Sequence, residues 1–299
     1  MDDRKKRFEL ALTFTLISAV FNAFFGFFSK EGTTVTSIVF LVFIRFAIPL
    51  VIIVPFILSM KSLRSFGKMR NTRNQVLRAM AVIITQYSLF FYLTKTSLLN
   101  ATMLWNTGPV FVPIIASLFY RQKISRITWF SSLVALVGVI CVIKPSSGIF
   151  DPYSVFGLIA GIGQGYSLVL YGINRVHHDT KENLIYFYGF TSFFALIILI
   201  ATNGVMGSTI EISPKITDLQ AIGLFLAMSL CSIFSQTFKG IAFNYKKPAS
   251  LSPFFYFSVI IAGGIDWIFY NHPPDFLAVV GTLLVIMGSF IKWSYATKH

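Results

Sequence analysis

Long apolar stretches with few charges alternate with short polar connectors along almost the whole chain. A helix of about 20 apolar residues crosses the hydrocarbon core of a bilayer, and ten stretches meet this requirement. Because lipid offers the backbone no hydrogen-bond partners, each stretch is expected to be a helix. The pattern therefore predicts an all-α polytopic membrane protein with ten transmembrane helices. The predicted spans are Phe8–Phe28, Val35–Leu58, Val76–Thr94, Leu98–Tyr120, Ile127–Ile143, Ser154–Asn174, Leu184–Thr202, Leu219–Phe238, Ala249–Tyr270 and Phe276–Tyr295.

Composition agrees with this interpretation, since 55% of the 299 residues are hydrophobic, 12% are charged and the mean hydropathy is +0.73. The connectors are short, so they leave no room for a soluble catalytic domain. The first span is too long for the apolar region of a signal peptide and is expected to be a retained helix. Function is therefore expected to lie inside the helical bundle.

The basic residues explain the net charge of +14 without a nucleic-acid partner. With the N-terminus inside, 19 Lys and Arg residues fall in inside segments and 4 in outside segments. The largest inside group, six residues from Lys61 to Arg78, is assigned to a cytoplasmic connector. This imbalance follows the positive-inside rule. It predicts an integral protein of the cytoplasmic (inner) membrane, in contact with lipid, with both termini cytoplasmic.

An internal repeat is visible at an offset of 150 residues, where Gly138 in the fifth span corresponds to Gly288 in the tenth. The alternative is a chance alignment of two glycine-dotted apolar helices. The repeat divides the chain into residues 1–148 and 149–299, with five predicted spans each. An odd number of spans per half makes the halves enter the membrane from opposite sides. The sequence thus predicts two inverted five-helix repeats, an architecture of carriers that work by alternating access.

Polar and aromatic side chains within the spans are the candidates for substrate binding, because polar groups in a membrane are costly. Aromatic rings with a polar edge and amides suit a small-molecule cavity. The alternatives are ordinary hydrogen bonds between helices and, near span ends, anchoring at the membrane interface. The predicted substrate-binding residues are Asn22, Tyr87, Trp105, Asn106, Gln164, Gln236 and Tyr256.

Three ionisable residues within or at the edge of the spans are predicted to have structural or charge-pairing roles. Arg45 stays charged and either braces the bundle against backbone carbonyls or binds a substrate carboxylate. Asp266 is the acid well inside a predicted span, and it could pair with a substrate cation, with Lys239 or with Arg45. Lys239 could instead reach the cytoplasmic headgroups.

Glycine and proline positions predict where helices approach closely or bend. Gly157, Gly161 and Gly165 form a ridge of small residues on the sixth predicted span, which favours a close helix contact. Pro109 and Pro113 in the fourth span and Pro253 in the ninth are expected to kink their helices. Because these two spans occupy equivalent places in the repeat, paired kinks could serve as gates.

Several segments taken together resemble the drug/metabolite transporter superfamily, EamA type. They are VFIRF around Arg45, TGPVFVPIIASLFY, TWFSSLVALVGVICVIKP, KKPASLSPFFYF and FLAVVGTLLVIMG, in this order. The resemblance implies a ten-helix inverted-repeat carrier whose central cavity is lined by spans one to four and six to nine. It places spans five and ten at the periphery, so the protein is a monomer or a homodimer through these spans. The chain has Gln122 and His272 where the family often has Glu.

The expected function is that of a secondary transporter for a small polar or zwitterionic metabolite, such as an amino acid, working by exchange or facilitated transport. The alternatives are a carrier of a nucleobase-bearing metabolite such as S-adenosylmethionine and an efflux carrier for drugs or metabolites. All four histidines lie in connectors or at the tail, and no catalytic or metal-binding motif is present. We therefore expect no catalytic residues, no metal, no cofactor and no enzymatic activity. Ten dissimilar spans also argue against a channel.

Overall fold

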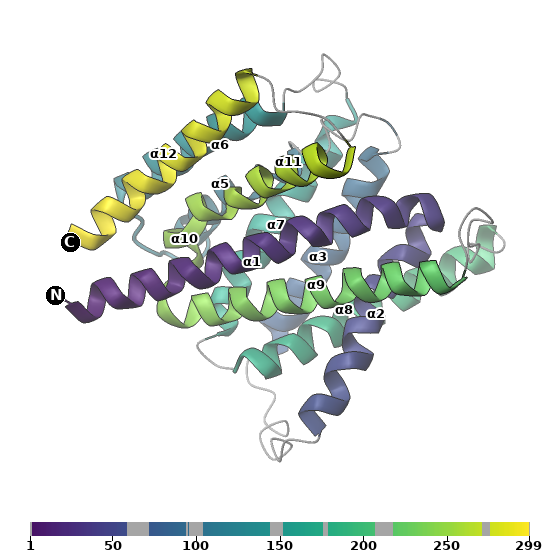
Figure 1. The fold of residues 1–299 in the computed structure, drawn as a ribbon. Coiled ribbons are helices and arrows are strands. Elements are labelled where there is room, and N and C mark those ends of the chain that lie inside the picture. The colour runs from purple at the N-terminus through teal and green to yellow at the C-terminus, as the bar shows by residue number, and fades with distance from the viewer. Residues whose placement is uncertain are drawn as a thin grey trace.

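The computed structural model describes residues 2–58, 72–93, 95, 104–143, 152–175, 179–206, 218–270 and 276–298 (Figure 1). These ranges form helices joined by turns, and they contain no β-sheet. The elements are α1 (Asp2–Val35), α2 (Ile38–Leu58), α3 (Thr72–Leu93), α5 (Gly108–Leu118), α6 (Arg126–Ile143), α7 (Ser154–Asn174), α8 (Thr180–Met206), α9 (Asp218–Tyr245), α10 (Pro248–Leu251), the 3₁₀ helix η3 (Ser252–Tyr256), α11 (Phe257–Tyr270) and α12 (Phe276–Lys298).

Six helical stretches within the described ranges are long and apolar enough to cross a membrane, and three shorter apolar helices accompany them. The prediction of an all-helical membrane protein is confirmed at this level. Helix α7 has the bounds of the sixth predicted span, whereas α1 is 34 residues long and extends beyond its predicted span at both ends. At 1.5 Å per residue α1 is about 51 Å long, so it must tilt or project from the hydrocarbon core.

Four helix pairs that are distant in sequence build the bundle, namely α1 with α9, α3 with α7, α2 with α8, and α6 with α12 (Figure 1). Helices α1 and α9 run antiparallel, because Phe14 stacks on Phe238 whereas Phe21 contacts Phe234. Between these contacts, the Ser18 hydroxyl donates to the Ser235 carbonyl oxygen at 2.9 Å. This bond joins the two helices near their middle.

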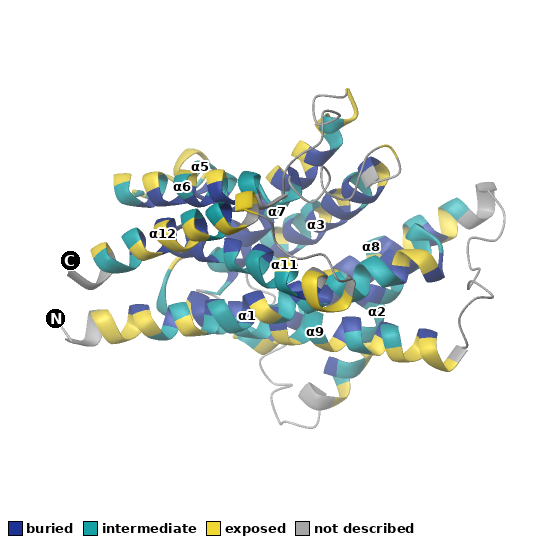
Figure 2. Ribbon diagram, turned by 45° about the horizontal axis from the view of Figure 1, so that its top comes forward, coloured by how far each residue is buried: buried dark blue, intermediate teal, exposed yellow. Residues whose placement is uncertain are grey.

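Helices α6 and α12 pack closely through glycines. A Cβ atom at Gly138 would lie 2.5 Å from the Gly281 carbonyl oxygen, and one at Gly288 would lie 2.7 Å from the Ser131 carbonyl oxygen. These contacts also make the pair antiparallel. The pair lies at one side of the bundle, and its outer surface is exposed (Figure 2), as for Phe290. This peripheral position agrees with the one that the resemblance implies for spans five and ten.

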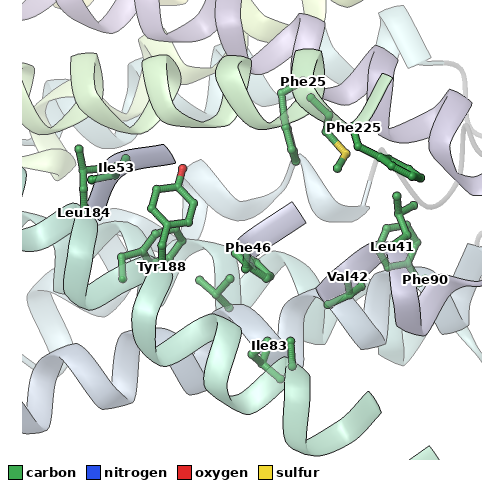
Figure 3. Packing of buried hydrophobic residues seen from close by; sticks show 14 of the residues in the cluster. Phe25, Leu41, Val42, Phe46, Ile53, Ile83, Phe90, Leu184, Tyr188 and Phe225 are labelled. Atoms are coloured by element: carbon green, nitrogen blue, oxygen red, sulfur yellow. The ribbon is translucent and has the colours of Figure 1, made fainter. Parts of the chain in front are cut away.

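A buried apolar cluster lies where α2 meets α3, α8 and α9 (Figure 3). Phe46 on α2 meets Phe187 on α8 edge to face, with ring centroids 6.0 Å apart. Large apolar side chains such as Ile200 are exposed on the outside of the bundle. Exposed apolar side chains are expected where the exterior of a bundle faces lipid rather than water.

Two of the predicted spans are interrupted at prolines. The ninth predicted span is divided into α10, η3 and α11, with Pro253 inside the 3₁₀ segment. In the fourth, α5 begins at Gly108 after a turn at Asn106–Thr107, and Pro109 occupies its first turn. Proline has no N–H to donate to the preceding turn, which explains both interruptions. Irregularities expected at Pro109 and Pro253 are thus present, whereas α5 continues through Pro113 without a break.

The predicted glycine ridge on α7 contacts the segment from Leu104 into α5. A Cβ atom at Gly161 would lie 2.6 Å from the Leu104 carbonyl oxygen, and one at Gly165 would lie 2.8 Å from the Gly108 carbonyl oxygen. These distances leave no room for a side chain. The close helix contact expected of the ridge is therefore confirmed, and it places α7 beside the interruption of the fourth predicted span.

Candidate functional site

Two adjoining hollows form one central cavity in the bundle. They share Asn22, Trp105, Gln164, Leu168 and Lys239. The lining comes from α1, α2, α3, residues 104–109, α7, α8, α9 and the η3–α11 segment. Helices α6 and α12 contribute none of the described lining residues. These contributions correspond to spans one to four and six to nine, as the resemblance implied.

Seven of the predicted site residues lie around this cavity. They are Asn22, Arg45, Trp105, Asn106, Gln164, Gln236 and Lys239. The fold thus brings together amides, cations and one indole from five separate segments. Their role in substrate binding stays a prediction.

Three other candidates do not appear in the described lining. Tyr256 is fully buried and packs with Val285 near the contact of α6 and α12. Tyr87 packs against the apolar cluster of α2 and α8. The side chain of Asp266 lies outside the described residues. Its backbone is in α11, eight residues after the lining residue Ser258, which is about 12 Å along the helix.

Arg45 is held by a side chain of α3 and by aromatic rings. Its Nη1 donates a hydrogen bond to Gln86 Oε1. Its guanidinium lies 4.4 Å from the ring centroid of Phe25 and 5.2 Å from that of Phe46, and such cation–π contacts favour a desolvated cation. The Nε atom is buried without a partner. Arg45 is thus held by Gln86 and the aromatic rings, and its structural or charge-pairing role stays a prediction.

Arg78 is a cavity residue that the charge count grouped with the cytoplasmic connector, although it falls near the start of the third predicted span, Val76–Thr94. Helix α3 begins at Thr72, so Arg78 lies well inside it and is only 2% exposed. Its guanidinium lies 3.7 Å from the ring centroid of Tyr171 and 4.2 Å from that of Phe187. Its Nη2 donates to Gln236 Oε1 at 3.2 Å.

A spacing signal could have identified Arg78. Arg78, Val82 and Gln86 recur at intervals of four, which places them on one face of a helix, and all three line the cavity. The connector assignment missed this face because it grouped Arg78 with the nearest charges in sequence. Ser235 was also missed, because a hydroxyl in an apolar helix gives no distinct sequence signal.

Lys239 is the third cation of the cavity and is 7% exposed. Within the described ranges, none of Arg45, Arg78 and Lys239 has a carboxylate at ion-pair distance. The described lining also contains no Asp, Glu, His or Cys. The described cavity can therefore bind and orient a ligand through amides, hydroxyls, cations and one indole.

Just beyond the cavity, Arg175 follows α7 and links it to α9. Its Nε donates to the Gly240 carbonyl oxygen at 3.1 Å, and its guanidinium also donates to the Asn244 side chain. Partial burial lowers the pKa of Arg175 from its usual value. These bonds fix the end of α7 against the last turns of α9, close to where Tyr171 donates to the Gln236 carbonyl oxygen at 2.8 Å.

Comparisons with known proteins place this fold among membrane transporters. Residues 9–144 match the model of the EamA-like transporter family. The pseudopaline exporter CntI of Pseudomonas aeruginosa is 26% identical over 201 residues, which are 67% of each chain. The S-adenosylmethionine uptake transporter of Rickettsia bellii is 23% identical over 301 residues, covering 98% of this chain and 97% of that protein. A known crystal structure superposes with a TM-score of 0.71 at 14% identity over 97% of this chain, which supports the fold alone.

Proposed function

We propose that this chain is a secondary carrier for a small polar metabolite, because residues 9–144 match the model of the EamA-like transporter family. The observation that carries the proposal is the central cavity, to which segments from both halves of the chain contribute polar groups. A binding site enclosed at the interface of two halves is what alternating access requires.

The packing of the helices supports an inverted repeat with the boundary between residues 148 and 149. At the offset of 150 residues, α1, α2 and α3 correspond to α7, α8 and α9, while α5 and α6 correspond to α11 and α12. Under this exchange the packed pair α1–α9 becomes α7–α3, and α2–α8 and α6–α12 map onto themselves. The antiparallel direction of α6 and α12 is the one that an inverted pair must have. Ten spans would complete the two repeats.

The two interrupted spans support a role in gating. The turn at Asn106–Thr107 and the 3₁₀ segment at Pro253 are equivalent in the repeat, and lining residues lie beside both. Broken helices expose backbone groups to a cavity and occur near the binding sites of many carriers. Motion at these breaks would open the cavity to one side or the other.

The substrate is a small polar or zwitterionic metabolite, moved by exchange or facilitated transport across the cytoplasmic membrane with both termini inside. The N-terminal end of α1 and the C-terminal end of α12 lie at the same end of the bundle, which supports a common side of the membrane for the two termini (Figure 1). A second candidate is a nucleobase-bearing metabolite, because a relative matched over nearly the whole chain is named for S-adenosylmethionine uptake and Trp105 could stack on a base. The relative named as an exporter leaves the direction of transport open.

Counterflow in proteoliposomes tests this proposal. Vesicles with the purified protein are loaded with one unlabelled metabolite from a panel of amino acids, organic acids and S-adenosylmethionine, and uptake of the same labelled compound is followed. A carrier gives saturable uptake that internal substrate accelerates, and exchange persists after the pH gradient is collapsed. Linear uptake that internal substrate does not accelerate would indicate a channel and contradict the proposal.

A further inference from the structure

Hydrogen-bond donors without acceptors accumulate in the central cavity. Among the described lining residues, the buried side-chain polar atoms that lack a partner are Arg45 Nε, Arg78 Nε and Nη1, and Trp105 Nε1. All four are N–H donors. Buried polar groups in native proteins are normally paired. An excess of unpaired donors over unpaired acceptors therefore indicates which kind of group a ligand must supply. A ligand of this cavity is therefore expected to supply acceptor oxygens.

Charge points in the same direction. Arg45, Arg78 and Lys239 contribute three cations to one lining, and the described part of the chain places no carboxylate beside any of them. Taking a cation out of water is costly unless an anion accompanies it. A ligand with a single carboxylate would leave two of the three cations without a counter-charge.

Aromatic rings keep the two guanidinium groups at separate points of the cavity. The Arg45 guanidinium lies against Phe46, the rings of Phe46 and Phe187 meet edge to face, and the Arg78 guanidinium lies against Phe187. Figure 3 shows Phe46 and Tyr188 within the packed cluster that supports this arrangement. Each guanidinium is thus fixed by packing and by one glutamine, with N–H groups left for a second partner.

We infer that the carrier's ligand is a small organic acid with a net negative charge and at least two acidic groups, carboxylate or phosphate. One acidic group binds at Arg45, another binds between Arg78 and Lys239, and Trp105 covers the apolar part of the ligand. The inference rests on the proposed carrier function and specifies its substrate class. It argues against S-adenosylmethionine, because a sulfonium and an ammonium group outweigh its one carboxylate and would add positive charge to three cations.

Matched acid and amide ligands test the charge preference with the unmodified protein. Thermal stabilisation of the purified full-length chain is measured with glutamate against glutamine, aspartate against asparagine, and citrate. A phosphate arm compares 3-phosphoglycerate with glycerate. We expect at least one acid to stabilise the protein at a concentration at least tenfold below that of its neutral or less acidic counterpart. Preference within the carboxylate arm or the phosphate arm identifies the acidic group.

Variants connect the preference to the cavity. Arg78→Gln should lower the affinity for the preferred acid at least tenfold, and Arg78→Lys, which keeps the charge, should lower it less. Arg73→Gln is the matched control, because Arg73 is an exposed residue of the same helix, and it should bind as the unmodified chain does.

Equal binding of every acid and its counterpart, or S-adenosylmethionine binding that Arg78→Gln leaves unchanged, would overturn the inference. Counterflow of a neutral or cationic metabolite would then still support the carrier. Binding of an acid without counterflow would instead support the anion-binding site and contradict the proposed carrier function.

Discussion

Arg45 and Arg78 each rely on one glutamine and on aromatic rings within the membrane-spanning part of the chain. Arg45 on α2 donates a hydrogen bond to Gln86 on α3, and Arg78 on α3 donates one to Gln236 on α9. Each glutamine thus accepts a hydrogen bond from an arginine of a different helix. A buried N–H that loses its acceptor destabilises the fold by its whole desolvation penalty. The glutamines are therefore as important for the cavity as the cations.

Replacing Gln86 tests this dependence. Gln86→Met should lower the free energy of unfolding by about 1–3 kcal/mol, because Nη1 of Arg45 loses its acceptor while the volume is conserved. Thermal unfolding in detergent measures the change. Gln220→Met is the control, since Gln220 is exposed at the start of α9 and its replacement should have little effect. Equal stability of the Gln86 variant and the control would show that Gln86 does not hold Arg45.

Trp105 is predicted to contact the ligand as well as the protein. It lines both hollows and also packs against the small cluster with Leu104 and Ala160. Trp105→Ala should weaken ligand binding by about 1–3 kcal/mol, by analogy with stacking on aromatic side chains. Trp105→Phe keeps a ring but lacks the indole N–H, and it should retain part of the affinity. Unchanged binding in the alanine variant would limit Trp105 to packing.

At the scale of elements, the glycines decide how closely the helices approach. Helix α7 can lie against the interrupted fourth span only because Gly157, Gly161 and Gly165 carry no side chains. Their spacing of four residues is a local pattern, so this contact could be anticipated from the sequence. The segment that packs against the ridge could not be anticipated, because many apolar helices of the chain could have packed there.

A methyl group at the ridge tests the contact. Gly161→Ala should destabilise the fold by about 1–3 kcal/mol, because its Cβ would lie 2.6 Å from the backbone oxygen of Leu104. Gly189→Ala on α8 is the matched control. A Cβ there meets nothing within 4 Å, and alanine favours a helix over glycine by about 0.5–1 kcal/mol. Thermal unfolding of both variants gives the comparison, and a ridge variant as stable as the control would contradict the close contact.

At the scale of the whole molecule, the charge distribution predicts the orientation in the membrane. Lys123 and Lys95 are exposed residues of described connecting segments, and the positive-inside rule puts them on opposite sides. In a chain with Cys141→Ala and Cys231→Ala, Lys95→Cys should react with an impermeant thiol reagent on intact cells. Lys123→Cys should react only after permeabilisation. The reverse pattern would invert the topology and place both termini outside.

From the sequence alone, the apolar helical segments could be located and the resemblance to EamA-type transporters recognised. These are local properties, because the transfer of a stretch of about 20 residues into lipid depends on its own side chains. Asn22, Trp105 and Gln164 could also be selected, since isolated polar groups in apolar helices stand out in the sequence. That these residues line one cavity could not be predicted from the sequence of any single helix.

Only the tertiary structure decided which polar residues face the cavity. Tyr256 and Arg78 show two opposite errors. Tyr256 was expected at the site but packs among apolar side chains, whereas Arg78 was grouped with connector charges but lines the cavity. The rotation of a helix in lipid is set by close contacts and hydrogen bonds with its neighbours rather than by a hydrophobic face. A hydropathy pattern therefore locates the helices, and their mutual packing determines the site.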